Sequence, residues 1–341
     1  MPYKHPTPGI ITQGIDQALV RMQMKTVIRL GTRRSALSLW QAKHVAGLIQ
    51  ARDPAVQVDI QQYRTLSDQN PAAPLRSLGR QGVFTDALEA ALRAREIDCA
   101  AHSLKDLPVE MPPGLALAAV TKRGDHRDAL VSRQRLALSQ LPVGARIGTG
   151  SLRRRAQLLA LRPDLKMRPI RGNVPTRLEK LKAADEYDAI VLAAAGLNRL
   201  GLSAQISETF DESQMLSAAG QGALAIQCRA GDAWLHFFQP LADWRATQAT
   251  AAERAFLHAL DAGCSLPVAA YSHVREGRLV LQARVTALDG ARQVDVSGSA
   301  ITDAGPAGVI QAEELGAELA QAAREQGADR ILESIEFGAD E

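Results

Sequence analysis

Apolar runs alternate with helix-like stretches through the first two thirds of the chain, and this alternation constrains the fold more than any other feature. Four runs predict strands, namely VIRLG (27–31), VQVDIQQY (56–63), DCAAHS (98–103) and ALAAV (116–120). Between them, Ser35 can cap a helix, and the apolar period predicts another helix over Phe84–Ala94. Strands that alternate with helices are typical of a largely parallel sheet.

The same pattern restarts after residue 145. A strand at Arg146–Gly148 leads to a helix at Leu152–Leu161, and a strand near Lys166–Ile170 leads to a helix at Pro175–Ala184. YDAIVLAAAG (187–196) then reads as a strongly buried strand. We therefore predict a second α/β domain of similar design.

The last hundred residues follow a different order. After a further strand in GQGALAIQCR (220–229), we predict a helix over Ala246–Leu260, three strands between Val268 and Gly298, and a helix over Ala312–Glu325. This order indicates a smaller α+β domain.

Composition bounds the class of protein. With 341 residues and 46% hydrophobic content, the chain can form two or three cores, and its 23% charged residues argue against disorder. A formal net charge of +3 is low for a general nucleic-acid binder. No apolar run is long enough to span a membrane. Residues 1–25 show no signal-peptide pattern, and we expect them to form a poorly ordered extension.

The three cysteines suggest neither a disulfide framework nor a zinc site, and we predict no metal. Cys99 and Cys228 lie in apolar runs, which predicts buried strand positions. Cys264 lies in DAGCSLP, a turn of small residues that exposes a thiol better. This usage fits a reducing cytoplasm.

A basic cluster lies between Ile147 and Arg177, with seven Arg, one Lys and one acid, Asp164. Two turns in it, GTGSLRRR and RGNVPTR, each join a predicted strand to a predicted helix. Helix N-termini favour anions, and both turns should open at the carboxyl edge of the sheet. The cluster predicts a small ligand with several negative groups. DNA is an alternative, but the chain shows no recognition-helix motif and no interleaved aromatic residues.

HSLKDLP (102–108) follows a predicted buried strand and ends at proline. A strand-end carboxylate beside a lysine is well placed for catalysis, although Lys105 and Asp106 taken alone would more often form a surface ion pair.

Eight segments of the chain resemble those of the hydroxymethylbilane synthase, or porphobilinogen deaminase, family, in the family's order. They are TRRSALSLWQA, AHSLKDLP, IGTGSLRRRAQL, RPDL, RGNVPTRLEKL, YDAIVLAAAGLNRLGL, AAGQGALAIQCR and ERAFLHALDAGCSLPV. The ordered set covers most of the chain from Val27 onward and is highly specific.

The resemblance implies two periplasmic-binding-protein-like (type II) α/β domains and a smaller C-terminal α+β domain. Domain 1 would comprise residues 26–122 and 220–240, domain 2 residues 123–219, and domain 3 residues 241–341. GQGALAIQCR would return the chain to domain 1. We also expect a cytoplasmic monomer that binds neither nucleic acid nor membrane.

The implied activity is the head-to-tail condensation of four porphobilinogen molecules with loss of ammonia, in porphyrin and haem biosynthesis. Each substrate forms an azafulvene that the free α-carbon of the growing chain attacks, and water finally releases hydroxymethylbilane. The chain grows on a dipyrromethane cofactor bound by a thioether, and Cys264 matches the cysteine that carries it.

The family's site residues match positions in this chain. Asp106 matches the catalytic acid. The cofactor-binding positions are Cys264, Lys105, Ser103, Thr149, Ser151, Arg153, Arg154 and Arg171. The substrate-binding positions are Arg33, Ser35, Arg177 and Arg199. The carboxylates of a bound pyrrole chain would account for the arginines.

The chain departs from the family pattern at several positions. Ser67 stands where glycine is usual, Gln81 and Asp86 where lysine is usual, and His126 where proline is usual. The departures at 67–82 lie in a loop expected to cover the site, so they bear on turnover. Two alternatives follow: a catalytically weak paralogue, and a two-lobed carboxylate-binding protein without catalysis, which would leave Cys264 and Asp106 without a role.

Overall fold

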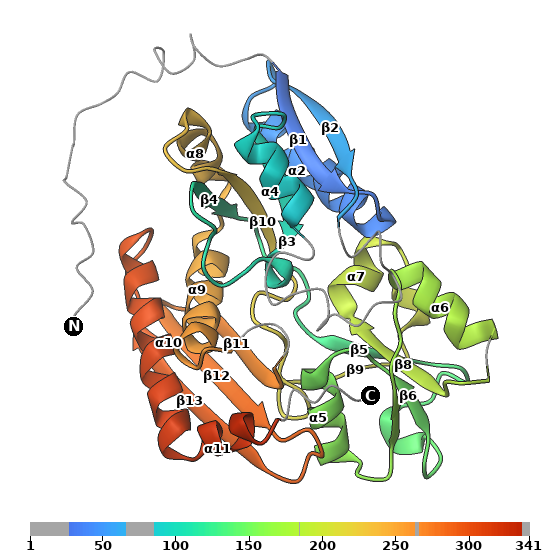
Figure 1. Ribbon diagram of the computed structural model, residues 1–341. Helices are drawn as coiled ribbons and strands as arrows, with labels where there is room; N and C mark the ends of the chain where they lie inside the picture. Colours follow the sequence, from blue (N-terminus) through green and yellow to red (C-terminus); the bar gives the residue numbers. More distant parts are fainter. Residues whose placement is uncertain (1–26, 66–84, 184, 263–265, 336–341) are drawn as a thin grey trace.

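The computed structural model describes residues 27–65, 85–183, 185–262 and 266–335. Figure 1 shows three units, and each is built on its own sheet. The predicted extension at residues 1–25 lies outside the described residues, as do Ser67, Gln81 and Cys264.

The first sheet has the strand order β2-β1-β3-β10-β4. Its strands are β1 (Val27–Arg33), β2 (Gln57–Tyr63), β3 (Cys99–Ser103), β4 (Leu115–Val120) and β10 (Leu224–Arg229). The helical segments of this unit are α2 (Ala36–Arg52), α4 (Asp86–Arg93), η2 (Leu104–Asp106), α8 (Ala233–Phe238) and η5 (Gln239–Leu241). β1 pairs in parallel with β2 and β3, whereas β10 runs antiparallel to both of its neighbours. Four of the five strands therefore share one direction.

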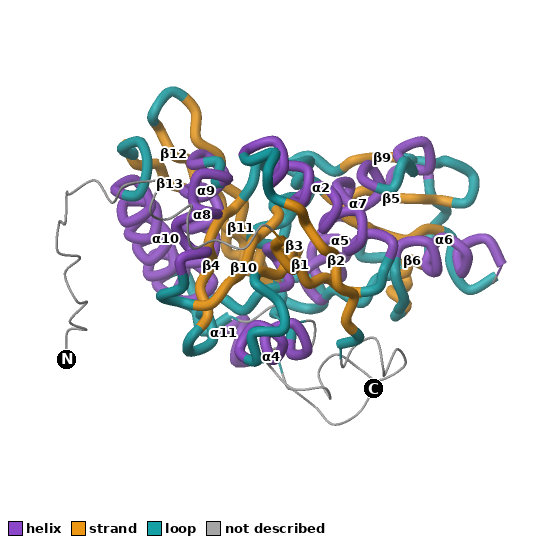
Figure 2. Tube along the Cα trace, turned by 90° about the horizontal axis from the view of Figure 1, so that it is seen from above, coloured by secondary structure: helices purple, strands orange, loops and turns teal. Residues whose placement is uncertain are grey.

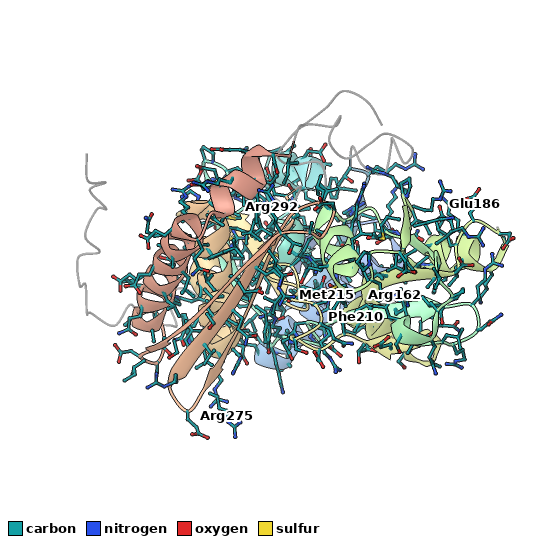
Figure 3. The ribbon with its side chains drawn as sticks, turned by 90° about the horizontal axis from the view of Figure 1, so that it is seen from below. Arg162, Glu186, Phe210, Met215, Arg275 and Arg292 are labelled. Atoms are coloured by element: carbon teal, nitrogen blue, oxygen red, sulfur yellow. The ribbon has the colours of Figure 1, made fainter. Side chains whose placement is uncertain are left out.

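The second sheet repeats this design in the order β7-β6-β8-β5-β9. Its strands are β5 (Asp128–Ser132), β6 (Arg146–Gly148), β7 (Lys166–Arg168), β8 (Ala189–Ala193) and β9 (Glu208–Thr209). The helical segments are η3 (Leu138–Gln140), α5 (Leu152–Leu161), α6 (Val174–Ala183), α7 (Ala194–Arg199) and η4 (Ser203–Gln205). Here β5 is the antiparallel strand. Phe210 and Met215, labelled in Figure 3, belong to the core on one face of this sheet.

Both sheets therefore confirm the predicted fold class. In each, the antiparallel strand is the one that the chain contributes after it crosses between the units: β5 follows the first crossing and β10 follows the second. The largely parallel sheet was predicted correctly, but β5 was not predicted as a strand. The domain boundaries at residues 122, 219 and 240 remain a prediction.

The third unit is an antiparallel sheet with helices on one side (Figure 2). It comprises α9 (Trp244–Ala259), β11 (Val268–Arg275), β12 (Arg278–Thr286), β13 (Gln293–Ile301), α10 (Ala307–Glu325) and α11 (Ala328–Glu333). The prediction that the last long helix begins at Ala312 was wrong by more than a turn. Its first turn packs so closely on α9 that a Cβ on Gly308 would lie 2.2 Å from the Gln248 side chain. The start of this helix therefore depends on its packing against α9, which the periodicity of apolar residues does not reveal.

The chain crosses from the first unit to the second between β4 and β5, and it returns between β9 and β10. These first and second crossings meet at a pair of glycines. Gly124 N donates a 3.0 Å hydrogen bond to Gly222 O. Gly222 has φ +88°, and a Cβ there would lie 2.7 Å from Gly124 O. Only glycine fits this approach, so the sequence fixes how closely the crossings pass.

Within the described part of the chain, no helix has both the length and the apolar character needed to cross a membrane.

Candidate active site

The strand-end segment that carries the predicted catalytic acid is held by buried neighbours. β3 ends at Ser103, whose Oγ accepts a 2.7 Å hydrogen bond from Nε2 of the buried Gln41 on α2. The next three residues form the short 3₁₀ turn η2, in which Leu104 is fully buried while Lys105 and Asp106 are half-buried. A buried leucine thus anchors a turn that presents an ammonium and a carboxylate side by side.

The lysine lies in a strongly charged environment. The pKa of Lys105 is lowered to about 8, chiefly by burial and also by the positive charges of Arg154 and Arg153, while the nearby carboxylates of Asp106 and Asp128 oppose this shift. Nζ of Lys105 donates a 3.1 Å hydrogen bond to Oε1 of Gln221. Lys105 therefore stands within electrostatic reach of the second unit's arginines.

The first predicted anion-binding turn has the expected form. β6 and β7 are parallel, and Thr149 N donates to Arg168 O at 2.9 Å, so both turns leave the same sheet edge. Thr149 Oγ1 accepts from Ser151 N at 3.1 Å, and Ser151 caps α5 by accepting from Arg154 N at 3.4 Å. The hydroxyls of both residues organise the N-terminus of α5.

Arg153 and Arg154 bind a carboxylate that sequence reasoning missed. Asp128 at the start of β5 is fully buried, and its Oδ2 accepts from Arg153 Nη1 at 2.7 Å. Its Oδ1 accepts from Arg154 Nε at 3.0 Å and Nη2 at 2.7 Å. Burial would raise the pKa of Asp128, but the two guanidinium groups hold it well below its usual range.

The second predicted turn carries arginines with fewer internal acceptors. Asn173 caps the start of α6, where its Oδ1 accepts from Thr176 N at 3.0 Å. Arg177 Nε donates to Gly172 O at 2.7 Å, and no carboxylate is bonded to this guanidinium in the described part of the chain. The pKa of Arg177 is lowered to about 10, chiefly by burial and also by the charges of Arg154 and Arg171, while Asp106 opposes this shift. Burial also lowers the pKa of Arg171.

The remaining predicted substrate residues are Arg33 at the end of β1, Ser35 at the N-cap of α2, and Arg199 at the end of α7. Ser35 caps α2 by accepting from Ser38 N at 3.1 Å, which confirms the predicted cap. Arg33 is half-buried at the end of β1. Arg199 Nη2 donates to Gly222 O at 2.6 Å, and its guanidinium lies 5.6 Å from the Trp40 ring centroid. Arg199 thus joins α7 both to α2 and to the second crossing.

The structure brings seven charged residues into one electrostatic group, which we call the cationic site. Its members are Lys105, Arg153, Arg154, Arg171, Arg177, Asp106 and Asp128. Five cations therefore meet two carboxylates, and both arginine pairs follow the strand-to-helix turns of one sheet edge. Such an excess of positive charge in a partly buried site is costly unless a ligand supplies anions.

Two of the three cysteines are poor nucleophiles. Cys99 and Cys228 are fully buried in β3 and β10, as predicted. Burial raises the pKa of the Cys228 thiol to about 12 and raises that of Cys99 well above its usual value. A thiolate is the reactive form, so neither residue suits covalent attachment.

Fold and site together define a class: a two-lobed α/β protein with a cationic site beside a strand-end carboxylate. Residues 28–236 match the model of the porphobilinogen deaminase dipyromethane cofactor binding domain, and residues 247–325 match that of the porphobilinogen deaminase C-terminal domain. The chain belongs to the porphobilinogen deaminase family.

Curated relatives match almost end to end. A porphobilinogen deaminase of Thermobifida fusca is 46% identical over 319 residues, which cover 93% of this chain and 99% of the relative. One of Syntrophotalea carbinolica is 44% identical over 313 residues, covering 92% and 97%. Among solved structures, the methionine binding protein MetQ matches 63% of this chain and 89% of its own at 14% identity, with a TM-score of 0.41.

Proposed function

We propose that the protein is a hydroxymethylbilane synthase, which condenses four porphobilinogen molecules head to tail, releases ammonia and yields a linear tetrapyrrole. The observation that carries this proposal is the cationic site, in which five cations interact electrostatically in one group that holds only two carboxylates, those of Asp106 and Asp128. Each pyrrole unit carries an acetate and a propionate, so an elongating chain would supply the missing negative charge.

The residues present suit a dipyrromethane cofactor, whose four carboxylates complement the surplus of positive charge. When bound, this group supplies the free pyrrole α-carbon on which the product is built. We propose that Ser103, Lys105, Thr149, Ser151, Arg153, Arg154 and Arg171 hold it, with Cys264 as its thioether anchor. The burial of Cys99 and Cys228 leaves Cys264 as the thiol best suited to that bond.

The arginine pairs would act differently on carboxylates. Asp128 already accepts three hydrogen bonds from Arg153 and Arg154. These two residues therefore contribute a fixed positive potential and only their remaining N–H groups. Arg171 and Arg177 hold their charge with fewer internal acceptors, so they can bind carboxylates more directly.

Asp106 would act on the reacting pyrrole. Its carboxylate can accept hydrogen bonds from pyrrole N–H groups and stabilise the positive charge that develops as ammonia leaves. It can also take up and return protons during condensation. Arg33, Ser35, Arg177 and Arg199 would bind the incoming substrate. We further propose that the protein works as a monomer in the cytoplasm.

Asp106→Asn tests the catalytic assignment. The variant keeps the shape of the side chain but loses its charge and its proton acceptor, so porphobilinogen consumption should fall about 10²–10⁴-fold. Asp59→Asn, at an exposed position on strand β2, is the control for the same chemical change away from the site and should keep its rate. Hydroxymethylbilane formation by Asp106→Asn at nearly the wild-type rate would remove Asp106 from the mechanism.

Intact mass tests the anchor and separates the alternatives. The wild-type protein should exceed its sequence mass by two linked pyrrole units, and Cys264→Ala should lose that increment together with activity. Cys228→Ala should keep both. An increment without porphobilinogen consumption would favour the weak paralogue, whereas neither increment nor turnover would favour a carboxylate-binding protein.

A further inference from the structure

Gln221 occupies the point where the second crossing returns to the first sheet. It is fully buried, and Gly220 and Gly222 beside it have φ of +72° and +88°. Its main chain is tied to its surroundings, because Gln221 O accepts from Arg123 Nε at 2.9 Å and Gly220 N donates to Glu253 Oε2 at 2.7 Å. The backbone that carries this amide is therefore fixed by contacts to the first crossing and to the third unit.

The Gln221 side chain joins the strand-end segment to the cationic site. Its Nε2 donates to His126 O at 2.7 Å and to Asp128 Oδ1 at 2.9 Å, and its Oε1 accepts from Lys105 Nζ at 3.1 Å. A carbonyl and a carboxylate can only accept, so the amide nitrogen must face them. The amide oxygen is then obliged to face Lys105, and the orientation of the group follows from its partners.

We propose that Gln221 is a positioning residue, which holds the Lys105 ammonium at a fixed place relative to the Asp128–Arg153–Arg154 group and so sets where the neighbouring Asp106 meets the pyrrole chain. This inference rests on the proposed function. Three observations carry it. The amide is fully buried, it makes three hydrogen bonds, and two of these bonds are to members of the cationic site, Lys105 and Asp128.

A neutral amide suits this place better than a charged group would. A carboxylate at position 221 would stand beside Asp128, and an ammonium would stand beside Lys105, so either would add like-charge repulsion in a buried site. The amide instead offers an acceptor to the cation and a donor to the anion. It couples the two without changing the net charge available to a ligand.

The titration of Lys105 is the direct readout. Lysine ε-methylene resonances of the purified protein, recorded against pH and assigned with Lys105→Arg, report the pKa of Lys105 whether or not the protein turns over. In Gln221→Met, the ammonium loses an acceptor, and the pKa of Lys105 should fall by about one unit, a tenfold change in its protonation equilibrium. The alkaline limb of kcat/KM should move to lower pH by the same amount.

Gln227→Met is the matched control, since Gln227 is also fully buried but lies within β10, where its Nε2 contacts Met111 Sδ at 4.0 Å. It should leave the titration of Lys105 unchanged. Gln221→Asn, which keeps a neutral amide but is one methylene shorter, covers failure of Gln221→Met to fold and should lower the pKa of Lys105 in the same direction. Gln221→Glu retains an acceptor for Lys105 but places a carboxylate beside Asp128, so its Lys105 should titrate no lower than in the wild type.

The proposal is overturned if Lys105 titrates alike in Gln221→Met and the wild type, if Gln227→Met shifts it equally, or if Gln221→Glu lowers its pKa. Failure of the wild-type protein to consume porphobilinogen would instead refute the proposed function. The titration of Lys105 would still test whether Gln221 controls the pKa of this lysine.

Discussion

The two pairs of arginines in the cationic site differ in what neutralises them. Arg153 and Arg154 share the buried carboxylate of Asp128, with contacts as short as 2.7 Å. Arg171 and Arg177 belong to the neighbouring turn, where Arg177 Nε donates a hydrogen bond to the backbone carbonyl of Gly172. The first pair is therefore largely neutralised within the protein, whereas we propose that the second pair keeps its charge for a ligand. Arginines of one basic cluster can thus differ in whether a carboxylate of the protein neutralises them.

The largest expected effect comes from removing the shared carboxylate. Asp128→Asn leaves two buried guanidinium groups facing a neutral amide, and breaking a buried ion pair costs about 3–5 kcal/mol. Urea unfolding at neutral pH should show this loss. Asp106→Asn, at a half-buried position, should change the free energy of unfolding much less. Equal losses in the two variants would erase the distinction between the architectural pair and the ligand-binding pair.

Acid should distinguish the buried carboxylate of Asp128 from two histidines with lowered pKa values. The pKa of both His102 and His126 is lowered to about 4, chiefly by burial, which for His126 outweighs the carboxylate of Glu212 at 2.9 Å from Nε2. Their folded-state pKa lies below the unfolded value of about 6.5, so their neutral forms stabilise the protein fully above that pH and lose this contribution as the pH falls towards 4. Asp128, whose pKa is depressed, keeps its contribution until the solution is more acidic than the ordinary aspartate pKa.

Between pH 7 and about pH 5, each of these histidines can therefore account for a loss of up to about 2 kcal/mol in the free energy of unfolding. His126→Gln should reduce the loss seen in urea titrations at the two pH values. His236→Gln, at an exposed position, should leave it unchanged. A stability that is flat over this range would contradict the assignment of buried neutral histidines.

The smallest expected effect is on the other arginine pair. Arg177→Leu removes one hydrogen bond to Gly172 O but also relieves repulsion from Arg154 and Arg171. The free energy of unfolding of cofactor-free protein should stay within about 1 kcal/mol of the value for wild-type protein in the same state. Elongation should nonetheless stall, which mass spectrometry of enzyme-bound intermediates can detect. A loss as large as that of Asp128→Asn would show that Arg177 is structural.

Local patterns in the sequence predicted local structure well. Ser35 caps α2, the strand and helix around Ser151 begin and end where expected, and Cys99 and Cys228 are buried. The two strand-to-helix turns share one sheet edge because parallel strands oblige them to. These features depend on periodicity and on residues close together in the chain, both of which a sequence displays.

Residues that act across the crossings could not be found in this way. Asp128 lies 25 residues before Arg153, and Gln221 lies 116 residues after Lys105. Nothing near Asp128 in the chain marks it as the partner of two arginines, and the glycines beside Gln221 suggest only a turn. An acidic residue that follows a polar segment and opens an apolar run, as Asp128 does in DALVS (128–132), is a signal that could have indicated both β5 and an internal counter-ion.

The exchange of antiparallel strands has a consequence for biosynthesis. Strand β10 lies between β3 and β4 in the first sheet, yet the ribosome delivers it only after the whole second unit has been made. Until Leu224 emerges, β3 and β4 lack the strand that joins them, and their open edges can pair with other chains. The first unit should therefore depend on chaperones while translation continues, and a chain stalled just before residue 224 should aggregate more readily than one stalled just after residue 240.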